Sequence, residues 1–333
     1  MAIRPRVGII GAGIAGLTLA KAISATGSVR VFEKSHGVGG RMATRWIDTV
    51  SYDHGAQYFT IRNDRFHDAL ETARANGVVE PWNGHVASLS DDGLLERPKS
   101  STVRYVGTPS MNALPKSMSV GLDIQPESTV GAITGEPGRW FVNIRDRTEG
   151  PFDWVIATAP APQSALMLPA RFAHHDKLGL VRMNGCFTLM VNIDTKHSAQ
   201  IPFAAAHVAD PVINWISLNN SKPGRPASPC LVVNSNAVWA DLNMDMPLEK
   251  VRQALIEAAR RHVQMDAGEA DTATVHRWRY ANVERPAGEP YLLDKGSQLA
   301  ACGDWCIGGR VEAAFLSAAG LGDALVALMG DAK

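Results

Sequence analysis

The sequence predicts a mixed α/β fold that combines a Rossmann-type dinucleotide-binding unit with an antiparallel sheet. Three observations support this prediction. A buried strand, a glycine-rich turn and an apolar helix follow one another over Val7–Ile23. Segments of strand composition, joined by loops and helices, fill Arg171–Trp278. A short strand, a glycine pair and a second apolar helix close the chain over Gln298–Met329.

The N-terminal turn has the GxGxxG spacing of dinucleotide-binding proteins. Directly after the apolar strand Val7–Ile10, it consists of Gly11, Ala12, Gly13, Ile14, Ala15 and Gly16. In this motif the first glycine turns the chain off the strand, the second lets backbone approach a pyrophosphate, and the third lets helix pack on strand. The helix N-terminus then offers free N–H groups to phosphate. We therefore expect these residues to hold a dinucleotide.

The second strand ends in an acidic residue that suits a ribose. It spans Val29–Lys34, and Glu33 lies about twenty residues beyond the glycines, where a carboxylate accepts hydrogen bonds from ribose hydroxyls. Lys34 follows directly and is assigned to the same site.

A glycine-rich loop, Ser35–Trp46, comes next and carries Gly40, Arg41 and Met42. Glycines let a loop run close to a ligand, and the forked donors of an arginine suit phosphate oxygens. A solvated surface loop would have the same composition. Its position beside a dinucleotide turn favours the binding role.

Composition points to a small-molecule partner. The chain of 333 residues has 33 basic and 33 acidic residues, so it has no charge excess for nucleic acid or an anionic membrane. The cysteines are too scattered for a disulfide framework or a zinc site and are expected to be reduced, and the histidines lack ligand spacing. No metal is predicted. The four cysteines are Cys186, Cys230, Cys302 and Cys306.

A cytoplasmic location is expected. Arg4 and Arg6 before an apolar stretch imitate a secretory signal, but cleavage there would delete the glycine turn. No other stretch is long and apolar enough, by this reasoning, to span a bilayer.

These motifs together resemble a known superfamily. GAGIAG, then Glu33, then GGRM at Gly39–Met42 and DHGAQYFT at Asp53–Thr60 resemble the FAD-binding opening of the flavin amine oxidases. GGRM, GAQYF and the later WRYA segment, Trp278–Ala281, resemble most the renalase group of that superfamily. The resemblance implies non-covalent FAD. It also implies the fold typified by p-hydroxybenzoate hydroxylase, in which a nucleotide-binding domain is interleaved with a substrate domain.

The expected domains follow from this resemblance. Residues 1–63, 103–160 and 298–333 would form the FAD-binding domain, and residues 64–102 and 161–297 the substrate domain. The first substrate-domain segment, residues 64–102, begins with a predicted helix over Asp64–Gly77. It continues through a Pro- and Gly-containing stretch, residues 81–98. Ile124–Ile133 alternates as a strand, and prolines from Pro160 onward break a buried strand.

The resemblance also implies further cofactor contacts. Gln57 lies in the segment that approaches the flavin, and Val130 would set its backbone against the adenine. Asp304 would accept a hydrogen bond from the ribityl or ribose part of FAD. The helix beginning near Val311 would point its N-terminus at the flavin pyrimidine ring, where N–H groups stabilise negative charge.

If the protein acts like a renalase, it oxidises isomeric dihydro-NAD(P) and passes the electrons to oxygen. A site for that substrate needs aromatic surfaces and polar groups. Tryptophans and tyrosines on strands also serve as ordinary core residues. The substrate-binding candidates are Tyr58, Tyr105, Trp215, Asn219, Trp278 and Tyr280.

Two alternatives stay open. A flavin amine oxidase acting on a small amine would share the same cofactor motifs. A non-catalytic flavin-binding protein would share them too. No catalytic residue beyond the flavin is required by the renalase-like reaction, because the cofactor itself accepts the hydride.

Overall fold

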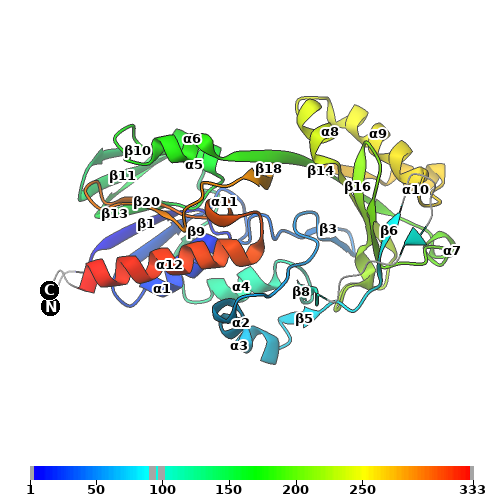
Figure 1. Cartoon of the computed structure of the whole chain (residues 1–333), viewed down its shortest axis with the longest axis horizontal. Coiled ribbons are helices and arrows are strands. Elements are labelled where there is room, and N and C mark those ends of the chain that lie inside the picture. The colour runs from blue at the N-terminus through cyan, green and yellow to red at the C-terminus, as the bar shows by residue number, and fades with distance from the viewer. Residues whose placement is uncertain (1–3, 90–94, 97–101, 331–333) are drawn as a thin grey trace.

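The computed structural model describes residues 4–89, 95–96 and 102–330. Figure 1 shows an elongated molecule with a sheet toward each end, and the long strands β14 (Arg182–Asn192) and β18 (Thr274–Arg285) run between the two halves. The stretch over residues 81–98 that is predicted to leave the FAD-binding domain lies partly outside the described residues.

The first sheet has six strands and holds the N-terminal strand near its centre. Its order is β19-β20-β13-β1-β2-β9, and all neighbours are parallel except the edge strand β19. The strands are β1 (Arg6–Ile10), β2 (Ser28–Phe32), β9 (Ile124–Gln125), β13 (Trp154–Ala157), β19 (Leu292–Asp294) and β20 (Leu299–Ala301). Segments distant in sequence thus share one Rossmann-type sheet, as predicted.

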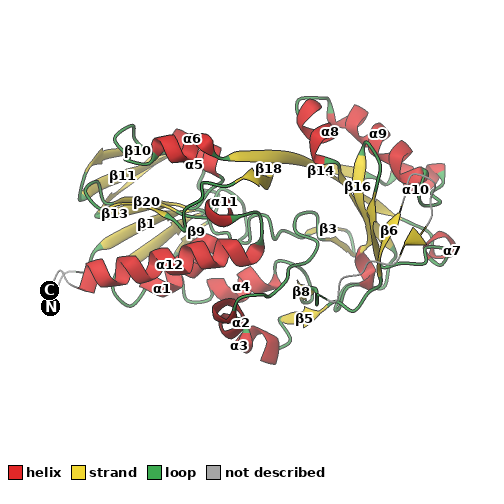
Figure 2. Cartoon of the chain, in the orientation of Figure 1, coloured by secondary structure: helices red, strands yellow, loops and turns green. Residues whose placement is uncertain are grey.

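Two layers cover this sheet, and the alternation of β1 explains both. Val7 and Ile9 belong to a buried cluster with the helices α1 and α12, whereas Ile10 belongs to a cluster on the opposite face. Figure 2 shows α12 along one side of the sheet. The covering helices and strands are α1 (Ile14–Ile23), α12 (Val311–Gly330), β10 (Val130–Glu136), β11 (Arg139–Ile144), β12 (Arg147–Phe152), α5 (Ala161–Met167) and α6 (His175–Leu180).

The second sheet has seven strands in the order β18-β14-β17-β16-β15-β6-β7. Its neighbours are antiparallel except β6 and β15, which confirms the predicted antiparallel sheet. The remaining strands are β6 (Val86–Leu89), β7 (Leu95–Glu96), β15 (Ala205–Val208), β16 (Ile213–Leu218) and β17 (Cys230–Ser235). The helices on this half are α7 (Thr195–Ser198), η1 (Asn219–Ser221), α8 (Ala237–Leu242), α9 (Leu248–Arg260) and α10 (Ala267–Asp271).

Small elements fill the space between the sheets. A buried cluster there joins Ile14 of α1 and Phe315 of α12 to Trp215 of the second sheet. The two halves therefore share apolar contacts around the glycine turn. These elements are β3 (Arg45–Ile47), β4 (Val50–Tyr52), α2 (Asp64–Ala69), α3 (Glu71–Ala75), β5 (Val79–Pro81), β8 (Tyr105–Gly107), α4 (Ala113–Ser119) and α11 (Asp304–Ile307).

Two predicted elements are divided in the structure. The strand predicted over Ile124–Ile133 splits into β9 and β10, because the chain turns at Glu127, whose φ is 53°. The helix predicted over Asp64–Gly77 splits into α2 and α3 at Leu70, whose side chain is buried.

The packing shows where the chain crosses between the two sheets. Helices α5 and α6 bury Met167, Phe172 and Leu178 in the cluster that contains β10–β13. The chain therefore reaches the second sheet at β14. It also returns to the first sheet at β19, which precedes the predicted return at Gln298.

Helix α12 is longer and more apolar than the sequence analysis expected of any segment. By length and composition, Val311–Gly330 could cross a membrane. In the structure it packs on α1 and buries Ala318, Leu321 and Leu325, and half of its most apolar window is buried. Its apolar composition is therefore explained by its place in the core.

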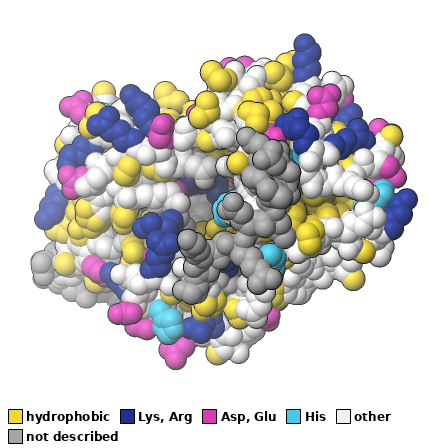
Figure 3. Space-filling view, turned by 45° about the vertical axis from the view of Figure 1, so that its right-hand side comes forward, with side chains coloured by type: hydrophobic (Ala, Val, Ile, Leu, Met, Phe, Trp, Pro, Cys, Tyr) yellow, Lys and Arg dark blue, Asp and Glu magenta, His cyan; other side chains and the backbone are white. Residues whose placement is uncertain are grey.

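Figure 3 shows basic and acidic side chains interspersed over the face in view.

Candidate cofactor and substrate site

The glycine turn has the geometry that the motif predicts. Gly11 has a φ of +108°, a conformation that favours glycine, and its N–H donates to the carbonyl of Phe32 at 2.8 Å. A Cβ on Gly16 would lie 1.9 Å from the carbonyl oxygen of Gly11, so only glycine allows this approach of helix to strand. A Cβ on Gly13 would meet nothing within 4 Å. No side-chain hydrogen bond caps the N-terminus of α1, so its N–H groups are available to a ligand.

Glu33 is fixed beside the turn. Its side chain is 4% exposed, and its two oxygens accept hydrogen bonds from the N–H of Ala12 at 2.8 Å and of Ser35 at 2.9 Å. A carboxylate oxygen has a second lone pair, so each can also accept from a ribose hydroxyl. The N–H of Ser128 donates to the backbone carbonyl of Glu33, which places the start of β10, Val130, near the same edge.

The GGRM loop meets the C-terminal GD segment. Arg41 donates to both carboxylate oxygens of Asp304, at 2.8 and 2.6 Å, and to the carbonyl of Ala281 in β18 at 3.1 Å. Gly40, with a φ of +54°, would set a Cβ 3.5 Å from the Cα of Gly13. Two residues predicted separately to touch FAD are therefore paired with each other, beside the pyrophosphate turn.

The segment that approaches the flavin in the superfamily lies against this loop. The N–H of Ala56 donates to the carbonyl of Arg41 at 2.8 Å, and a Cβ on Gly55 would lie 2.0 Å from that carbonyl oxygen. The side chain of Gln57 folds back and donates to the carbonyls of Asp53 and Gly55. Its oxygen accepts from Ser217 and Lys222 at 3.0 and 3.2 Å. Gln57 thus braces its own turn.

The N-terminus of α12 is held against residues 62–63 and against β18, the strand that Arg41 also contacts. Glu312 is 4% exposed and accepts hydrogen bonds from the N–H groups of Arg62 and Asn63, at 2.7 and 2.8 Å. A Cβ on Gly309 would lie 3.0 Å from the backbone nitrogen of Val283 in β18. Val311 is half-buried at the start of the helix.

These features fit an FAD molecule. The open space before Gly13, the uncapped helix end and the fixed Glu33 suit pyrophosphate and ribose. The GGRM loop contacts the Asp53–Gln57 turn, and both the loop and the start of α12 contact β18 of the second sheet. FAD bound here would be held by Glu33, by the turn and by Arg41 with Asp304.

Sequence reasoning missed a buried charged cluster under the Asp53–Gln57 turn. The Asp53 carboxylate lies 3.1 Å from the amine of Lys222 and 2.6 Å from the guanidinium of Arg225, and all three side chains are fully buried. Asn219 belongs to this cluster, since its amide accepts from Lys222 at 2.8 Å and donates to the carbonyl of Ser51. Asn219, which was predicted to contact the substrate, is 0% exposed, and its side chain bonds to other residues of the protein.

The other substrate candidates form separate groups. Tyr58 lies 5.7 Å from Trp215, between ring centroids, and the guanidinium of Arg104 covers the Tyr58 ring at 5.3 Å. Tyr105 stacks instead on Phe59 at 6.2 Å. Tyr280 is half-buried on β18, two residues after Trp278.

Trp278 is held against the Asp53–Gln57 turn, the flavin-approaching turn of the superfamily, by His54, which the motifs did not single out. Its indole N–H donates to the carbonyl of His54 at 2.8 Å, and the two rings stack at 5.3 Å with an interplanar angle of 23°. His276 completes the group, 4.4 Å from Trp278 and within 3.2 Å of Arg45. Burial lowers the pKa of His276 to about 4, with help from the charges of Arg45 and Lys34. This aromatic wall is neutral at pH 7.

Acid is expected to destabilise the folded protein through His54. Burial, aided by His276 and Arg45, lowers the pKa of His54 from 6.5 to about 4. Between these values the unfolded chain binds more protons than the folded one. The free energy of unfolding therefore falls as pH falls from 6.5 to 4, by about 3 kcal/mol at pH 4. Urea unfolding at several pH values measures this slope.

His54→Gln is expected to flatten that dependence because glutamine does not titrate. The matched control is His67→Gln, which alters an exposed histidine of α2 and should leave the slope unchanged. An equal slope in His54→Gln and the unaltered protein would contradict the assignment of a neutral, buried His54.

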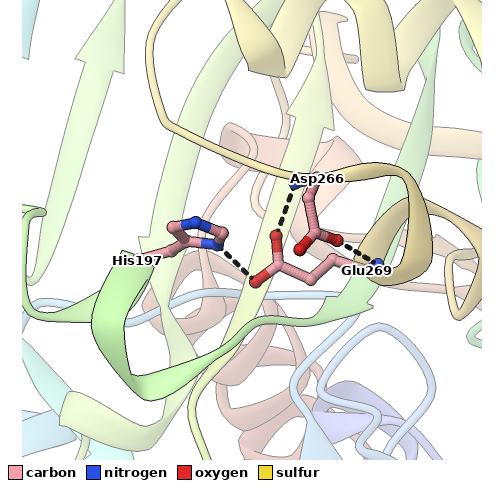
Figure 4. Close-up of side chains that lie close together, drawn as sticks. All are labelled: His197, Asp266 and Glu269. Atoms are coloured by element: carbon pink, nitrogen blue, oxygen red, sulfur yellow. Dashed lines mark hydrogen bonds and ion pairs between the residues drawn. The ribbon is translucent and has the colours of Figure 1, made fainter.

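One group among the described residues has the chemistry of metal ligands. Figure 4 shows His197, Asp266 and Glu269, whose ligand atoms lie within 4.8 Å of one another. Glu269 accepts from the ring of His197 and from the N–H of Asp266, both at 2.7 Å, and Asp266 accepts from the N–H of Glu269 at 2.9 Å. This is the capping box of α10. The group is explained as a helix cap, and the absence of a metal stays a prediction.

The fold and this site define a flavin-dependent oxidoreductase, and sequence comparison gives its family. The family model for an NAD(P)-binding Rossmann-like domain matches residues 9–72, and the model for flavin-containing amine oxidoreductases matches residues 87–319. The chain belongs to the flavin-containing amine oxidoreductase family.

Individual relatives agree with this assignment. Mouse renalase is 24% identical over 307 residues, covering 84% of this chain and 85% of that protein. A structure from Exiguobacterium sp. 255-15, described as a protoporphyrinogen oxidase, has a TM-score of 0.79 at 15% identity and covers 96% of this chain and 98% of that one. Putrescine oxidase bound to putrescine has a TM-score of 0.71 at 12% identity, with 98% and 99% covered.

These findings confirm the predicted fold class, the resemblance to renalases and FAD as the cofactor. The protein is an oxidoreductase of this superfamily. The roles of individual residues, the domain boundaries and the non-covalent attachment of FAD stay predictions.

Proposed function

We propose that this protein is a renalase-like oxidase of isomeric dihydro-NAD(P). The observation that carries the proposal is the wall formed by Trp278 and His54, which is fixed to the Asp53–Gln57 turn, the turn expected to approach the flavin. The half-buried ring of Trp278, backed by the buried and neutral His54, suits a planar dihydronicotinamide ring. The similarity to mouse renalase supports the same reaction.

The reaction needs positioning more than acid–base catalysis. Bound FAD would supply the hydride acceptor, and oxygen would take the electrons to give NAD(P)+ and hydrogen peroxide. The chain's own task is then to hold the donor ring, to exclude water and to stabilise negative charge. Trp278 serves the first task, and the buried His54 holds its ring in place. The N–H groups at the start of α12 serve the last.

The charges around the aromatic residues favour this substrate over an amine. Tyr58 and Trp215 form a close aromatic pair, the arrangement that amine oxidases commonly present to their substrate. However, the guanidinium of Arg104 lies over Tyr58, and the amine of Lys222 lies 5.5 Å from the ring centroid of Trp82. Cations in this position repel an alkylammonium ion and attract an anionic dinucleotide.

Product analysis tests the proposal. Air-equilibrated protein with bound FAD is mixed with borohydride-generated dihydro-NAD(P) isomers, and NAD(P)+ and hydrogen peroxide are measured. We expect equal amounts of the two products at a rate well above that without protein. Peroxide formation with small amines, and none with the dihydronicotinamides, would favour the amine oxidase alternative instead. No turnover with either would favour a non-catalytic flavin-binding protein.

Trp278→Ala is expected to slow reduction by substrate much more than it lowers flavin content. The variant loses the ring that stacks on His54 but keeps the residues that surround Glu33 and Arg41. We expect at least a tenfold loss in kcat/KM, about 1.4 kcal/mol of transition-state stabilisation. Flavin absorbance per protein and kcat/KM are the measurements. Trp239→Ala is the control, since Trp239 packs on Phe187 at the far side of the second sheet.

A further inference from the structure

The charged cluster beneath the flavin-approaching turn holds more cations than anions. Lys222 and Arg225 share one carboxylate, Asp53, at 3.1 and 2.6 Å. Among the described residues, Asp53 is the carboxylate that pairs with either cation. Its remaining oxygen accepts from the hydroxyl of Thr44 at 2.7 Å and from the N–H of Met111 at 3.0 Å, which are neutral donors.

Other titratable groups beside the cluster do not cancel the excess. Burial raises the pKa of the Cys230 thiol to about 12, and burial raises the pKa of Tyr52 as well, so both are neutral. His54, the next residue to Asp53, is also neutral at pH 7. Burial opposes ionisation of Asp53, but the two cations outweigh it and lower its pKa to about 2. The cluster therefore has a net positive charge below about pH 8, the value to which burial lowers the pKa of Lys222.

The cluster is coupled directly to the turn. The amine of Lys222 donates to Gln57 at 3.2 Å and to Asn219 at 2.8 Å. Gln57 in turn donates to the carbonyls of Asp53 and Gly55, and the neighbouring Ala56 bonds to the GGRM loop. Lys222 is thus separated from the flavin-approaching backbone by a single side chain. A charge in a dry interior acts over longer distances than one at the surface.

From these observations we infer that Asp53, Lys222 and Arg225 form a buried positive centre that raises the reduction potential of the bound flavin and positions Gln57. A flavin gains negative charge when it is reduced, so a nearby uncompensated cation stabilises the reduced form relative to the oxidised one. Lys222 and Arg225 act through the turn and are positioning residues. The inference depends on FAD binding and not on the proposed substrate.

Lys222→Met and Lys222→Gln test this inference. Both remove the excess charge and leave Asp53 paired with Arg225, while glutamine also keeps an N–H donor for Asn219 and Gln57. The readouts are the midpoint potential of the bound flavin and the dissociation constant for sulfite. Sulfite donates its lone pair to flavin N5 and leaves the negative charge on the flavin, so its affinity reports the same electrostatics without any dinucleotide substrate.

We expect a lower midpoint potential and at least tenfold weaker sulfite binding in both variants. Arg261→Gln is the matched control, because Arg261 pairs at 2.7 Å with the buried Asp210 in the second half of the molecule. If Lys222→Met does not fold, Lys222→Gln alone decides. Folded variants whose midpoint potential equals that of the unaltered protein, and whose dissociation constant for sulfite lies within twofold of its value, would overturn the inference. Because sulfite reports on the flavin alone, this failure is distinct from failure to oxidise dihydro-NAD(P).

Discussion

Glu33→Arg is expected to release FAD from the protein. In the structure the Glu33 carboxylate is held by the N–H groups of Ala12 and Ser35, at 2.8 and 2.9 Å, beside the glycine turn, where a ribose is expected to bind. An arginine accepts no hydrogen bond and adds a cation beside the N-terminus of α1. Losing two hydrogen bonds to a charged group, at about 1.5–3 kcal/mol each, corresponds to about 100-fold weaker binding or more.

Flavin content after dialysis and the dissociation constant of FAD measure this effect. Glu71→Arg is the control, because it makes the same change on an exposed residue of α3. The control should retain its flavin. A Glu33→Arg variant that retains FAD as fully as the control would contradict the ribose role of Glu33.

Asp53→Asn is expected to destabilise the protein strongly. The substitution leaves the amine of Lys222 and the guanidinium of Arg225 buried with no counter-ion. Removing one partner from a buried ion pair costs about 3–5 kcal/mol, since the remaining charge stays desolvated. Here two cations lose the same partner and also repel each other. We therefore expect the free energy of unfolding to fall by about 3 kcal/mol or more.

Urea unfolding at pH 7 and a fixed FAD concentration measures this change. Asp245→Asn is the matched control, since Asp245 pairs with Arg279 but its side chain is 85% exposed. Exposed pairs contribute little to stability because water screens them, so this variant should unfold at nearly the same urea concentration as the unaltered protein. Equal decreases in the free energy of unfolding in Asp53→Asn and Asp245→Asn would contradict a stabilising role of Asp53 as counter-ion to Lys222 and Arg225.

The fold was predictable where local chemistry determines it. The spacing of Gly11, Gly13 and Gly16 predicts a tight turn between a strand and a helix. The structure has this turn between β1 and α1. The sheet on which each covering helix packs was less predictable. Helices α5 and α6 have no pattern that says which sheet they cover, since any apolar face can be buried against either.

The candidate site was predictable only in its cofactor half. Glu33 and Arg41 stand in recognisable motifs. Lys222 and Arg225 lie in a loop that reads as proline- and glycine-rich, and such loops usually run over the surface with solvated charges. The available signal was a lysine and an arginine placed between two strongly apolar strands, together with an unpaired acidic residue, Asp53, in the flavin-approaching motif.

Asn219 shows the limit of residue-type reasoning. An asparagine at the end of a strand suits either a ligand or the protein's own backbone, and the choice depends on tertiary contacts. In the structure it bonds to Lys222 and to the carbonyl of Ser51. His54 was missed for a related reason, since a single histidine in a motif does not reveal that Trp278 and His276 lie beside it.

Anaerobic mixing of the flavin-loaded protein with dihydro-NAD(P) isomers tests the central claim most directly. Flavin absorbance is followed in a stopped-flow instrument after addition of the borohydride-generated isomers or, separately, of simple amines and polyamines. We predict rapid bleaching by one or more dihydronicotinamide isomers, slower bleaching in Trp278→Ala and no bleaching by amines. Rapid bleaching by an amine, with no response to any dihydronicotinamide isomer, would contradict the proposed function.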